Sequence, residues 1–529
     1  MTAGDPNTAA QLEKQIWQLM KAGKLEQAAA ACDQLNQAFP DYGPGWNTSS
    51  RLAISLNEPV IALQAVQRAL LLSPGKPEWL LQKMASLAVY GDLKAANIIA
   101  DEIAEHVFET AYHASTCAVT MNRMQRYADA ERHYLRAVEL SPNNPNYRFN
   151  LATAQRFMGK LDAATESLNR AIELNPLDCE SQLLRSGFRT YTKSENNIDS
   201  LLSALEKIPQ EHPGRVQLCY ALAKELDDLQ RYDESFERLQ QGASIRRSKL
   251  PYKPDQDLTA MRTIREQFSA DVFASPVAGF VNAEPIFVIG MPRAGTALVE
   301  RVLNNHSVVR TVGEPQSFGI ELVNQCELVM GATPVNAKEL MSAAKQIDFA
   351  ALGEAYHNSA KPVSGSYAHF VDKLPINFMY AGLIHLALPK AKIILVERDP
   401  VDNCYAAFKT LFPGPYPYSY DLHELANYYV GYAQLMSHWR EMMPEVMLTV
   451  RYEDLVTKSR ATTEDLLEYC DLSFEEGCLN FYSDSEQAST ASAVRLRHEL
   501  RANAIGHWKN YADQLRPVAE ILRQGGVST

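Results

Sequence analysis

The second half of the chain alternates short apolar runs with longer amphipathic segments. The apolar runs, such as 286–289, are rich in β-branched residues and predict buried strands, whereas helical spacing of apolar residues predicts helices. Expected strands are 285–290, 368–373, 392–397 and 446–452; expected helices are 295–304, 336–347, 376–388, 400–410, 421–442 and 454–470. This alternation predicts an α/β domain with a parallel sheet covered on both faces.

The first half of the chain has a different pattern, in which small residues recur at a fixed spacing. Alanine returns every 34 positions, at Ala28, Ala62, Ala96, Ala130 and Ala164. Proline has the same spacing at Pro40, Pro74, Pro142 and Pro176, with Phe108 at the missing step. Close packing of paired helices needs a small residue at the crossing, and this period resembles tetratricopeptide repeats. The pattern therefore predicts an all-α solenoid.

The repeat pattern and the proline residues also predict the domain organisation. We count five good repeats over 9–178 and a degenerate sixth helix pair that extends to about 250. Pro251 and Pro254 end the solenoid, because proline cannot continue a helix. The expected organisation is a solenoid over 1–252, a linker over 253–283 and the α/β domain over 284–520.

Composition and charge narrow the class of protein. The chain has 529 residues, 46% of them hydrophobic, and a net charge of −12, which argues against general binding of nucleic acid. No apolar run approaches the roughly 20 residues that a membrane span requires, and the N-terminal residues do not resemble a signal peptide. The eight cysteines are scattered without a C-x-x-C pair, which favours reduced thiols over a zinc site. We therefore expect a cytoplasmic protein.

The segment 284–303 is the strongest candidate for a binding site. A buried strand leads through a turn that contains Gly290, Arg293 and Gly295 into a helix. The N–H groups at the start of that helix and the arginine together favour an anion. The nucleotide triphosphatase loop needs Lys and then Ser or Thr, where this chain has Thr296 and Ala297. The remaining interpretations are a phosphate-type ligand without that magnesium site and a tight turn without a ligand.

Four side chains fall at or just beyond the carboxyl ends of the predicted strands. They are Arg293, Lys373, Arg398 and Tyr452. Because ligands of open parallel sheets bind at that edge, these residues predict one shared pocket.

The turn 292–298, Pro-Arg-Ala-Gly-Thr-Ala-Leu, resembles the Pro-Arg-Ser-Gly-Thr-Thr-Leu loop of sulfotransferases. That loop occurs in tyrosylprotein sulfotransferases and in relatives fused to tetratricopeptide repeats, which use 3′-phosphoadenosine 5′-phosphosulfate as donor. Further segments resemble the same family in the same order, at 311–315, 370–375, 392–400, 447–455, 490–492 and 505–508. The chain is therefore identified as similar to a tetratricopeptide-repeat sulfotransferase, with a P-loop-like phosphosulfate loop.

The resemblance implies a role for each site residue. Glu314 is the implied general base, Lys373 acts at the leaving oxygen, and Arg293 stabilises the 5′-phosphosulfate. The implied donor-binding positions are Arg293, Ala294, Gly295, Thr296, Ala297, Leu298, Arg398, Ala406, Tyr452 and Arg501, with Arg497 as second choice for Arg501. No metal is implied, because arginine, lysine and helix N–H groups can supply the positive field.

Each assignment also has a structural alternative. These are a solvated turn residue or helix cap for Glu314, a surface lysine or a pair with Asp372 for Lys373, a strand exit for Arg398, a core aromatic for Tyr452 and a solvated charge for Arg501. We expect Asp399 to cap a helix, and His306 and His507 to be structural, because neither has metal-ligand spacing.

The expected function is transfer of a sulfuryl group to a hydroxyl of a peptide, glycan or small molecule. The repeats would recruit the acceptor or a protein partner, or mediate self-association. Ala294, Ala297 and Ala406 stand where the family has hydroxyl donors, which weakens the expected donor binding. The alternative is a non-catalytic relative whose repeats act as an interaction scaffold.

Overall fold

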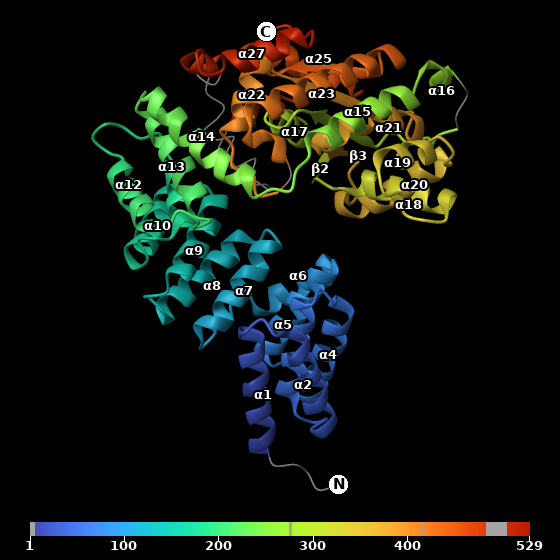
Figure 1. Ribbon diagram of the computed structural model, residues 1–529. Helices are drawn as coiled ribbons and strands as arrows, with labels where there is room; N and C mark the ends of the chain where they lie inside the picture. The colour runs from blue at the N-terminus through green and yellow to red at the C-terminus, as the bar shows by residue number, and fades with distance from the viewer. Residues whose placement is uncertain (1–5, 275–277, 415, 483–504) are drawn as a thin grey trace. The chain divides into compact units, whose positions relative to one another are not determined.

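The computed structural model describes residues 6–274, 278–414, 416–482 and 505–529 (Figure 1). The chain divides into two compact units, Met1–Pro176 and Leu177–Thr529. The first unit is helical, and the second carries a parallel sheet. The predicted fold class, a helical repeat solenoid followed by a domain with a parallel sheet, is confirmed.

The first unit consists of paired antiparallel helices in its described part. They are α1 Pro6–Lys21, α2 Leu25–Ala38, α3 Gly43–Ser55, α4 Pro59–Leu72, α5 Pro77–Tyr90, α6 Leu93–Ile103, α7 Ala111–Arg123, α8 Tyr127–Leu140, α9 Pro145–Phe157 and α10 Leu161–Leu174. The alanines that recur every 34 residues lie on the second helix of each pair, and all of them have 0% exposure. The small residues therefore stand where helices pack closely.

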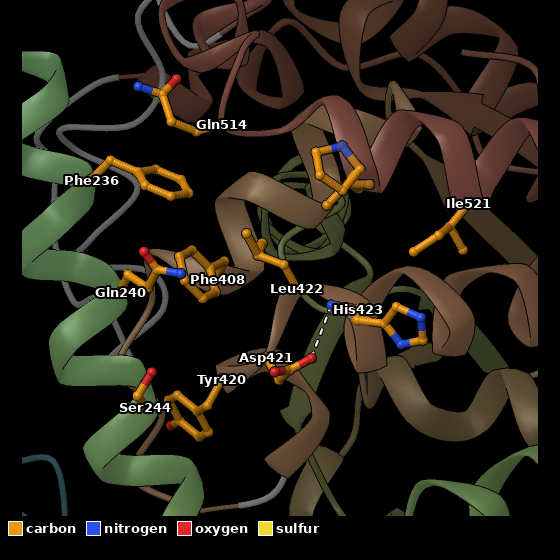
Figure 2. A pocket seen from close by; sticks show the side chains of 12 residues that line it. Phe236, Gln240, Ser244, Phe408, Tyr420, Asp421, Leu422, His423, Gln514 and Ile521 are labelled. Carbon is orange, nitrogen blue, oxygen red and sulfur yellow. Dashed lines mark hydrogen bonds between the residues drawn. The ribbon is translucent and has the colours of Figure 1, made fainter.

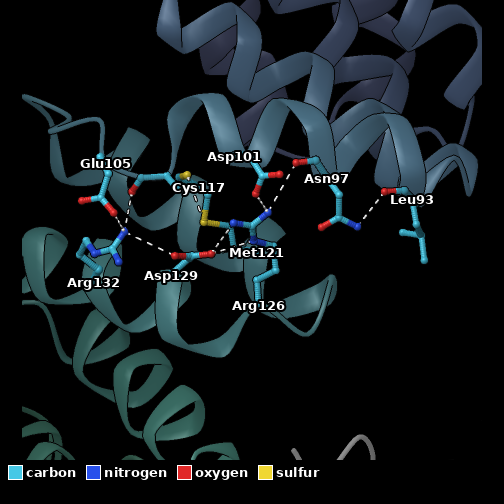
Figure 3. A network of polar contacts seen from close by, with 10 residues as sticks. Leu93, Asn97, Asp101, Glu105, Cys117, Met121, Arg126, Asp129 and Arg132 are labelled. Atoms are coloured by element: carbon cyan, nitrogen blue, oxygen red, sulfur yellow. Dashed lines mark hydrogen bonds and ion pairs between the residues drawn. The ribbon is translucent and has the colours of Figure 1, made fainter.

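Charged side chains connect neighbouring repeats of this unit (Figure 3). Arg126 lies 2.5 Å from Asp101 on α6 and 2.7 Å from Asp129 on α8. Arg132 on α8 lies 2.8 Å from Glu105, which follows α6. Because most of these groups contact solvent, each pair contributes little stability, and the buried alanine crossings dominate the packing.

The second unit is built on a sheet of five parallel strands in the order β2-β3-β1-β4-β5. Their bounds are β1 Pro285–Gly290, β2 Val309–Gly313, β3 His369–Asp372, β4 Lys392–Glu397 and β5 Met447–Arg451. Side chains on both faces of β1 are buried, so helices and loops cover the sheet on both sides at its centre. The parallel strands bring their carboxyl ends to one edge.

The helices of the sheet-containing part follow the strands closely. They are α17 Thr296–Asn304, α18 Ser317–Met330, α19 Ala337–Ala344, α20 Phe349–Ser364, α21 Ala381–Ala387, α22 Pro400–Phe408, α23 Leu422–Met442, α24 Tyr452–Thr457, α25 Ser459–Tyr469 and α27 Arg516–Gln524, with 3-10 helices η1 Pro375–Tyr380, η2 Pro417–Tyr420, η3 Glu476–Tyr482 and η5 His507–Tyr511. The sequence pattern did not predict β2, α18, α20 or α27. β2 is an edge strand with one buried residue, Val309, and therefore lacks the apolar run that marks a buried strand.

The boundary of the second unit differs from the predicted domain boundary after residue 252. The helices α11 Cys179–Ser186, α12 Ile198–Lys207, α13 Arg215–Asp228 and α14 Tyr232–Ser248 belong to the same compact unit as the sheet. Tyr220 of α13 donates a hydrogen bond to the Phe408 carbonyl at 3.3 Å, and Phe236 of α14 packs in the same core. The expected linker contains α15 Pro254–Gln267 and α16 Ala270–Ala274, and Met261 and Ile264 of α15 are buried. Apolar packing therefore joins these helices to the sheet.

A buried carboxyl group lies at the end of β3. Asp372 accepts hydrogen bonds from the Tyr356 hydroxyl at 2.9 Å and the Asn377 amide at 3.1 Å. Burial raises the pKa of Asp372 from 3.8 to about 7, although the hydrogen bond from Tyr356, a backbone hydrogen bond from Leu374 and the charge of Lys373 lower it. Between about pH 4 and pH 7, Asp372 therefore carries a proton in the folded chain that it has lost in the unfolded chain.

We predict that Ala130→Leu destabilises the first unit by about 1–3 kcal/mol, because the larger side chain overpacks a closed helix crossing. Urea unfolding followed by circular dichroism measures the change. Leu135→Ala, at a position 50% exposed on the same helix, is the control and should change stability by less than about 0.5 kcal/mol. An unchanged midpoint for Ala130→Leu would contradict close packing at this crossing.

We predict that the stability of the wild type falls relative to Asp372→Asn as the pH rises from about 4 to 8. The pKa of Asp372 is raised to about 7 in the folded state, so its contribution is complete below pH 4 and is lost as the pH passes 7. The loss should be about 4 kcal/mol for a shift of this size. Urea unfolding across pH measures it, with the exposed Asp465→Asn as control. Parallel pH profiles for wild type and Asp372→Asn would rule out this buried titration.

Candidate functional site

The loop between β1 and α17 packs tightly against the neighbouring strands. Gly290 and Gly295 have φ angles of 150° and 104°. A Cβ atom at 290 would lie 2.5 Å from the Val396 carbonyl oxygen, and one at 295 would lie 2.6 Å from the Tyr452 ring. Arg293 has a φ angle of 68°, in the left-handed region that is unfavourable for residues other than glycine. Such backbone conformations are concentrated at functional sites. The loop therefore needs glycine at both positions and holds Arg293 in a strained backbone.

Three of the predicted donor-binding residues meet beside this loop. Arg398, directly after β4, donates a long hydrogen bond of 3.4 Å to the Arg293 carbonyl. Its guanidinium lies 4.7 Å from the ring centre of Tyr452, the first residue of α24. Burial raises the pKa of Tyr452, and the positive charges of Arg398 and Arg293 oppose that rise. A positive, aromatic surface thus forms at the carboxyl ends of β1, β4 and β5.

The predicted catalytic pair lies at the ends of β2 and β3. The Lys373 ammonium contacts the Glu314 carboxylate. The backbone N–H of Lys373 donates a hydrogen bond to the Gly313 carbonyl at 2.9 Å. The Lys373 side chain is 1% exposed, whereas that of Glu314 is 41% exposed. The lysine is therefore enclosed, and the glutamate keeps a face open to solvent. Asp372, the predicted alternative partner of Lys373, instead accepts hydrogen bonds from Tyr356 and Asn377.

A second carboxylate, which the sequence analysis did not identify, lies beside this pair. Glu300 Oε2 on α17 is 3.5 Å from Lys373 Nζ. Burial raises the pKa of Glu300, while Lys373 and a hydrogen bond from Thr311 oppose the rise. The sequence signal for Glu300 is an acidic residue within the buried apolar stripe of α17, between Val299 and Val302.

Lys409, at the C-terminal end of α22, is another cation that the sequence analysis missed. Its ammonium lies 5.1 Å from the Tyr405 ring. Surrounding protein lowers the pKa of Lys409, the charge of Asp227 raises it, and the charges of Arg398 and Arg293 lower it further. The residue still contacts solvent, so this desolvation is partial. Lys409 therefore adds to the positive field around the loop, eleven residues after Arg398 and without a motif of its own.

Asp402 joins this positive surface to the C-terminal segment. Its side chain accepts hydrogen bonds from the Gly506 N–H at 2.7 Å and the Trp508 N–H at 3.2 Å. The same carboxylate lies 3.4 Å from Arg398 Nη2. Asp399 caps α22 by accepting from the Asp402 N–H at 2.9 Å, which confirms the predicted cap. The segment 505–508 is thereby fixed next to the loop.

The remaining predicted donor-binding positions either carry uncharged side chains or lie outside the described residues. Ala294 and Ala406 are buried, whereas Ala297 is partly buried, and Thr296 and Leu298 begin α17. Arg501, Arg497 and the segment 490–492 lie outside the described residues. The two histidines make structural contacts: His306 lies 2.9 Å from the Ser473 carbonyl, and His507 lies 2.9 Å from Asp227.

A separate pocket of about 260 Å³ lies among α14, α22, η2 and α27 (Figure 2). Its lining is mostly apolar, with Phe236, Phe408 and Ile521, and Asp421 at its rim caps α23. No residue predicted for the donor site lines it. The cluster around Arg293 and Lys373 is therefore the stronger candidate for chemistry, since it combines convergent charges with strained backbone.

Within the described ranges, no helix is both long and apolar enough to cross a membrane.

Comparisons with known proteins support the division of the chain into two kinds of module. Residues 285–476 match the model of the sulfotransferase family, and residues 133–166 match that of the tetratricopeptide repeat. An uncharacterised protein of Aquifex aeolicus (strain VF5) is 27% identical over 375 residues, which cover 70% of this chain and 49% of that protein. The chain thus spans about half the length of this curated relative.

Two solved structures are among those similar to parts of this chain. The sulfotransferase domain from the curacin biosynthetic pathway has 16% identity and a TM-score of 0.32, over 47% of this chain and 99% of that domain. PilW, a type IV pilus biogenesis factor, has 15% identity and a TM-score of 0.31, over 47% of this chain and 96% of PilW. The chain therefore combines residues 133–166, which match the tetratricopeptide repeat, with residues 285–476, which match the sulfotransferase family.

Proposed function

We propose that the chain transfers a sulfuryl group from 3′-phosphoadenosine 5′-phosphosulfate to the hydroxyl of a peptide, glycan or small molecule. The observation that carries this proposal is the convergence of two charged groups at the carboxyl edge of one parallel sheet. One group is the Arg293 loop with Arg398 and Tyr452, and the other is the Lys373–Glu314 pair. The first group suits a phosphorylated nucleotide, and the second suits removal of a proton from a hydroxyl.

The residues present fit such a donor. The absence of Cβ atoms at Gly290 and Gly295 keeps the loop backbone close to the sheet and leaves N–H groups at the start of α17. Arg293 and Arg398 supply permanent positive charge for phosphate groups, and the Tyr452 ring supplies an aromatic surface beside them. When bound, the donor supplies an activated sulfuryl group attached to a phosphate that can leave.

Glu314 and Lys373 have different roles in this reaction: one accepts a proton and the other stabilises negative charge. Glu314, which is open to solvent, takes the proton of the acceptor hydroxyl while the hydroxyl oxygen bonds to sulfur. Lys373 and Arg293 offset the negative charge that remains on the phosphate oxygen when its bond to sulfur breaks. Before reaction, the contact with Lys373 orients the Glu314 carboxylate. We further propose that the repeats recruit the acceptor or a protein partner, or mediate self-association.

A non-catalytic scaffold is the second candidate function. Ala294, Ala297 and Ala406 offer methyl groups where the resembling family has hydroxyl donors. Hydrogen bonds that involve a charged group are roughly twice as strong as neutral ones, so retention of the cations favours donor binding over the scaffold.

We predict that adenosine 3′,5′-bisphosphate raises the melting temperature of the protein. Ligand at 100 times its Kd stabilises the folded state by about 2.7 kcal/mol. Differential scanning fluorimetry measures the shift. Glu314→Gln should keep the shift and lose sulfuryl transfer to a panel of peptide, glycan and phenol acceptors, whereas the exposed Glu441→Gln should keep both. No shift at millimolar ligand would refute a donor site; loss of the shift in Glu314→Gln would make Glu314 structural.

We predict that Lys409→Met weakens binding of adenosine 3′,5′-bisphosphate about tenfold, because an ionic hydrogen bond contributes about 1.5–3 kcal/mol. Adenosine 5′-monophosphate, which carries one phosphate fewer, should lose less affinity if Lys409 faces the 3′-phosphate. Isothermal titration calorimetry compares the two ligands, with the exposed Lys390→Met as control. Unchanged affinity for both nucleotides would exclude Lys409 from the site.

A further inference from the structure

The Lys373 ammonium lies between two carboxylates that differ sharply in their surroundings. It contacts Glu314, whose side chain is 41% exposed, and lies 3.5 Å from Glu300, whose side chain is 7% exposed. An enclosed ammonium is costly unless it is paired, and here two partners share it. Two carboxylates in different environments are suited to different roles.

We propose that Glu300 is a positioning residue for sulfuryl transfer, which holds the Lys373 ammonium at the reacting group while Glu314 accepts the acceptor proton. This inference rests on the proposed function. It assigns a task to a carboxylate that is too deeply buried to meet an acceptor, since its side chain is only 7% exposed.

Glu300 is itself held in place from the neighbouring strand. The Thr311 hydroxyl on β2 donates a hydrogen bond of 2.5 Å to Glu300 Oε1, which leaves Oε2 directed at Lys373. The Thr311 backbone N–H donates to Asn304 Oδ1 at 2.9 Å, and this contact ties β2 to the end of α17. The carboxylate therefore has one oxygen fixed by Thr311 and one available for the ammonium.

The division of roles follows from charge balance during the reaction. When Glu314 takes the acceptor proton it becomes neutral, and its attraction for Lys373 disappears. Without Glu300, neither of the two carboxylates that pair with the ammonium would then attract it at the moment when the leaving phosphate needs it. Glu300, whose Oε2 lies 3.5 Å from Lys373 Nζ, holds the ammonium in place through that step.

The position of Glu300 also connects this pair to the donor loop. Glu300 lies five residues after Gly295 on the helix whose first turn closes the loop. A rigid helix of this length fixes the separation between the loop and the carboxylate. The position of Lys373 relative to the donor site therefore depends on α17 as well as on β3. A change at Glu300 should affect binding of the donor and binding of its product differently.

The test compares binding of the donor with binding of its product, in the full chain. Adenosine 3′,5′-bisphosphate lacks the sulfuryl group, so a displaced Lys373 should weaken 3′-phosphoadenosine 5′-phosphosulfate selectively. For Glu300→Gln we expect the ratio of the two affinities, measured by calorimetry without acceptor, to fall about tenfold, since a factor of ten corresponds to about 1.4 kcal/mol. The product affinity should stay within about twofold, and Glu300→Asp should restore part of the ratio.

Release of sulfate from the donor into buffer needs no identified acceptor. In Glu300→Gln, its rate should fall along with the ratio of donor to product affinity. The exposed Glu266→Gln is the matched control and should leave both measurements unchanged. Thr311→Val removes the hydroxyl that fixes Glu300 while all charges remain, and it should shift the ratio in the same direction by a smaller factor. This variant decides the matter if Glu300→Gln does not fold.

An unchanged ratio in folded Glu300→Gln or Thr311→Val would overturn the inference. Equal loss of affinity for both nucleotides would also overturn it, because it would make Glu300 a structural residue of α17. If the wild type binds neither nucleotide, the proposed function itself fails and this inference falls with it.

Discussion

The close approach of the β1–α17 loop to its neighbours is the constraint on which the candidate site depends. Side chains at 290 and 295 would collide with the Val396 carbonyl and the Tyr452 ring. Because glycine at both positions lets the loop lie close against the sheet, Arg293 comes beside Arg398 where α17 begins. The parallel strands then bring the remaining groups to the same edge without any long connection between them.

The sequence was informative where the side-chain pattern is strong. Buried runs such as 286–289 and the alanines at 34-residue spacing predicted the central strands and the helix pairs correctly. Ordered short motifs also identified Arg398 and Tyr452, which lie together in the structure. These features depend on residues close in sequence or on a fixed period, so a single chain displays them directly.

Features that arise from tertiary contacts could not be read in the same way. β2 is stabilised by pairing with β3 rather than by an apolar run of its own, and its sequence therefore looked like a loop. Glu300 acquires its significance only when Lys373 arrives from a strand 73 residues later. Lys409 and Asp402 likewise lie on an ordinary helix, and only folding brings them to the loop.

The contacts of Asp402 make the end of the chain part of the electrostatics of the loop. This buried carboxylate shares its charge among the N–H groups of Gly506 and Trp508 and the guanidinium of Arg398. A chain that stopped before residue 505 would remove two of these three partners, and the undivided negative charge would draw the guanidinium away from the Tyr452 ring. Backbone groups of the C-terminal segment thereby share the carboxylate that faces the Arg398 guanidinium.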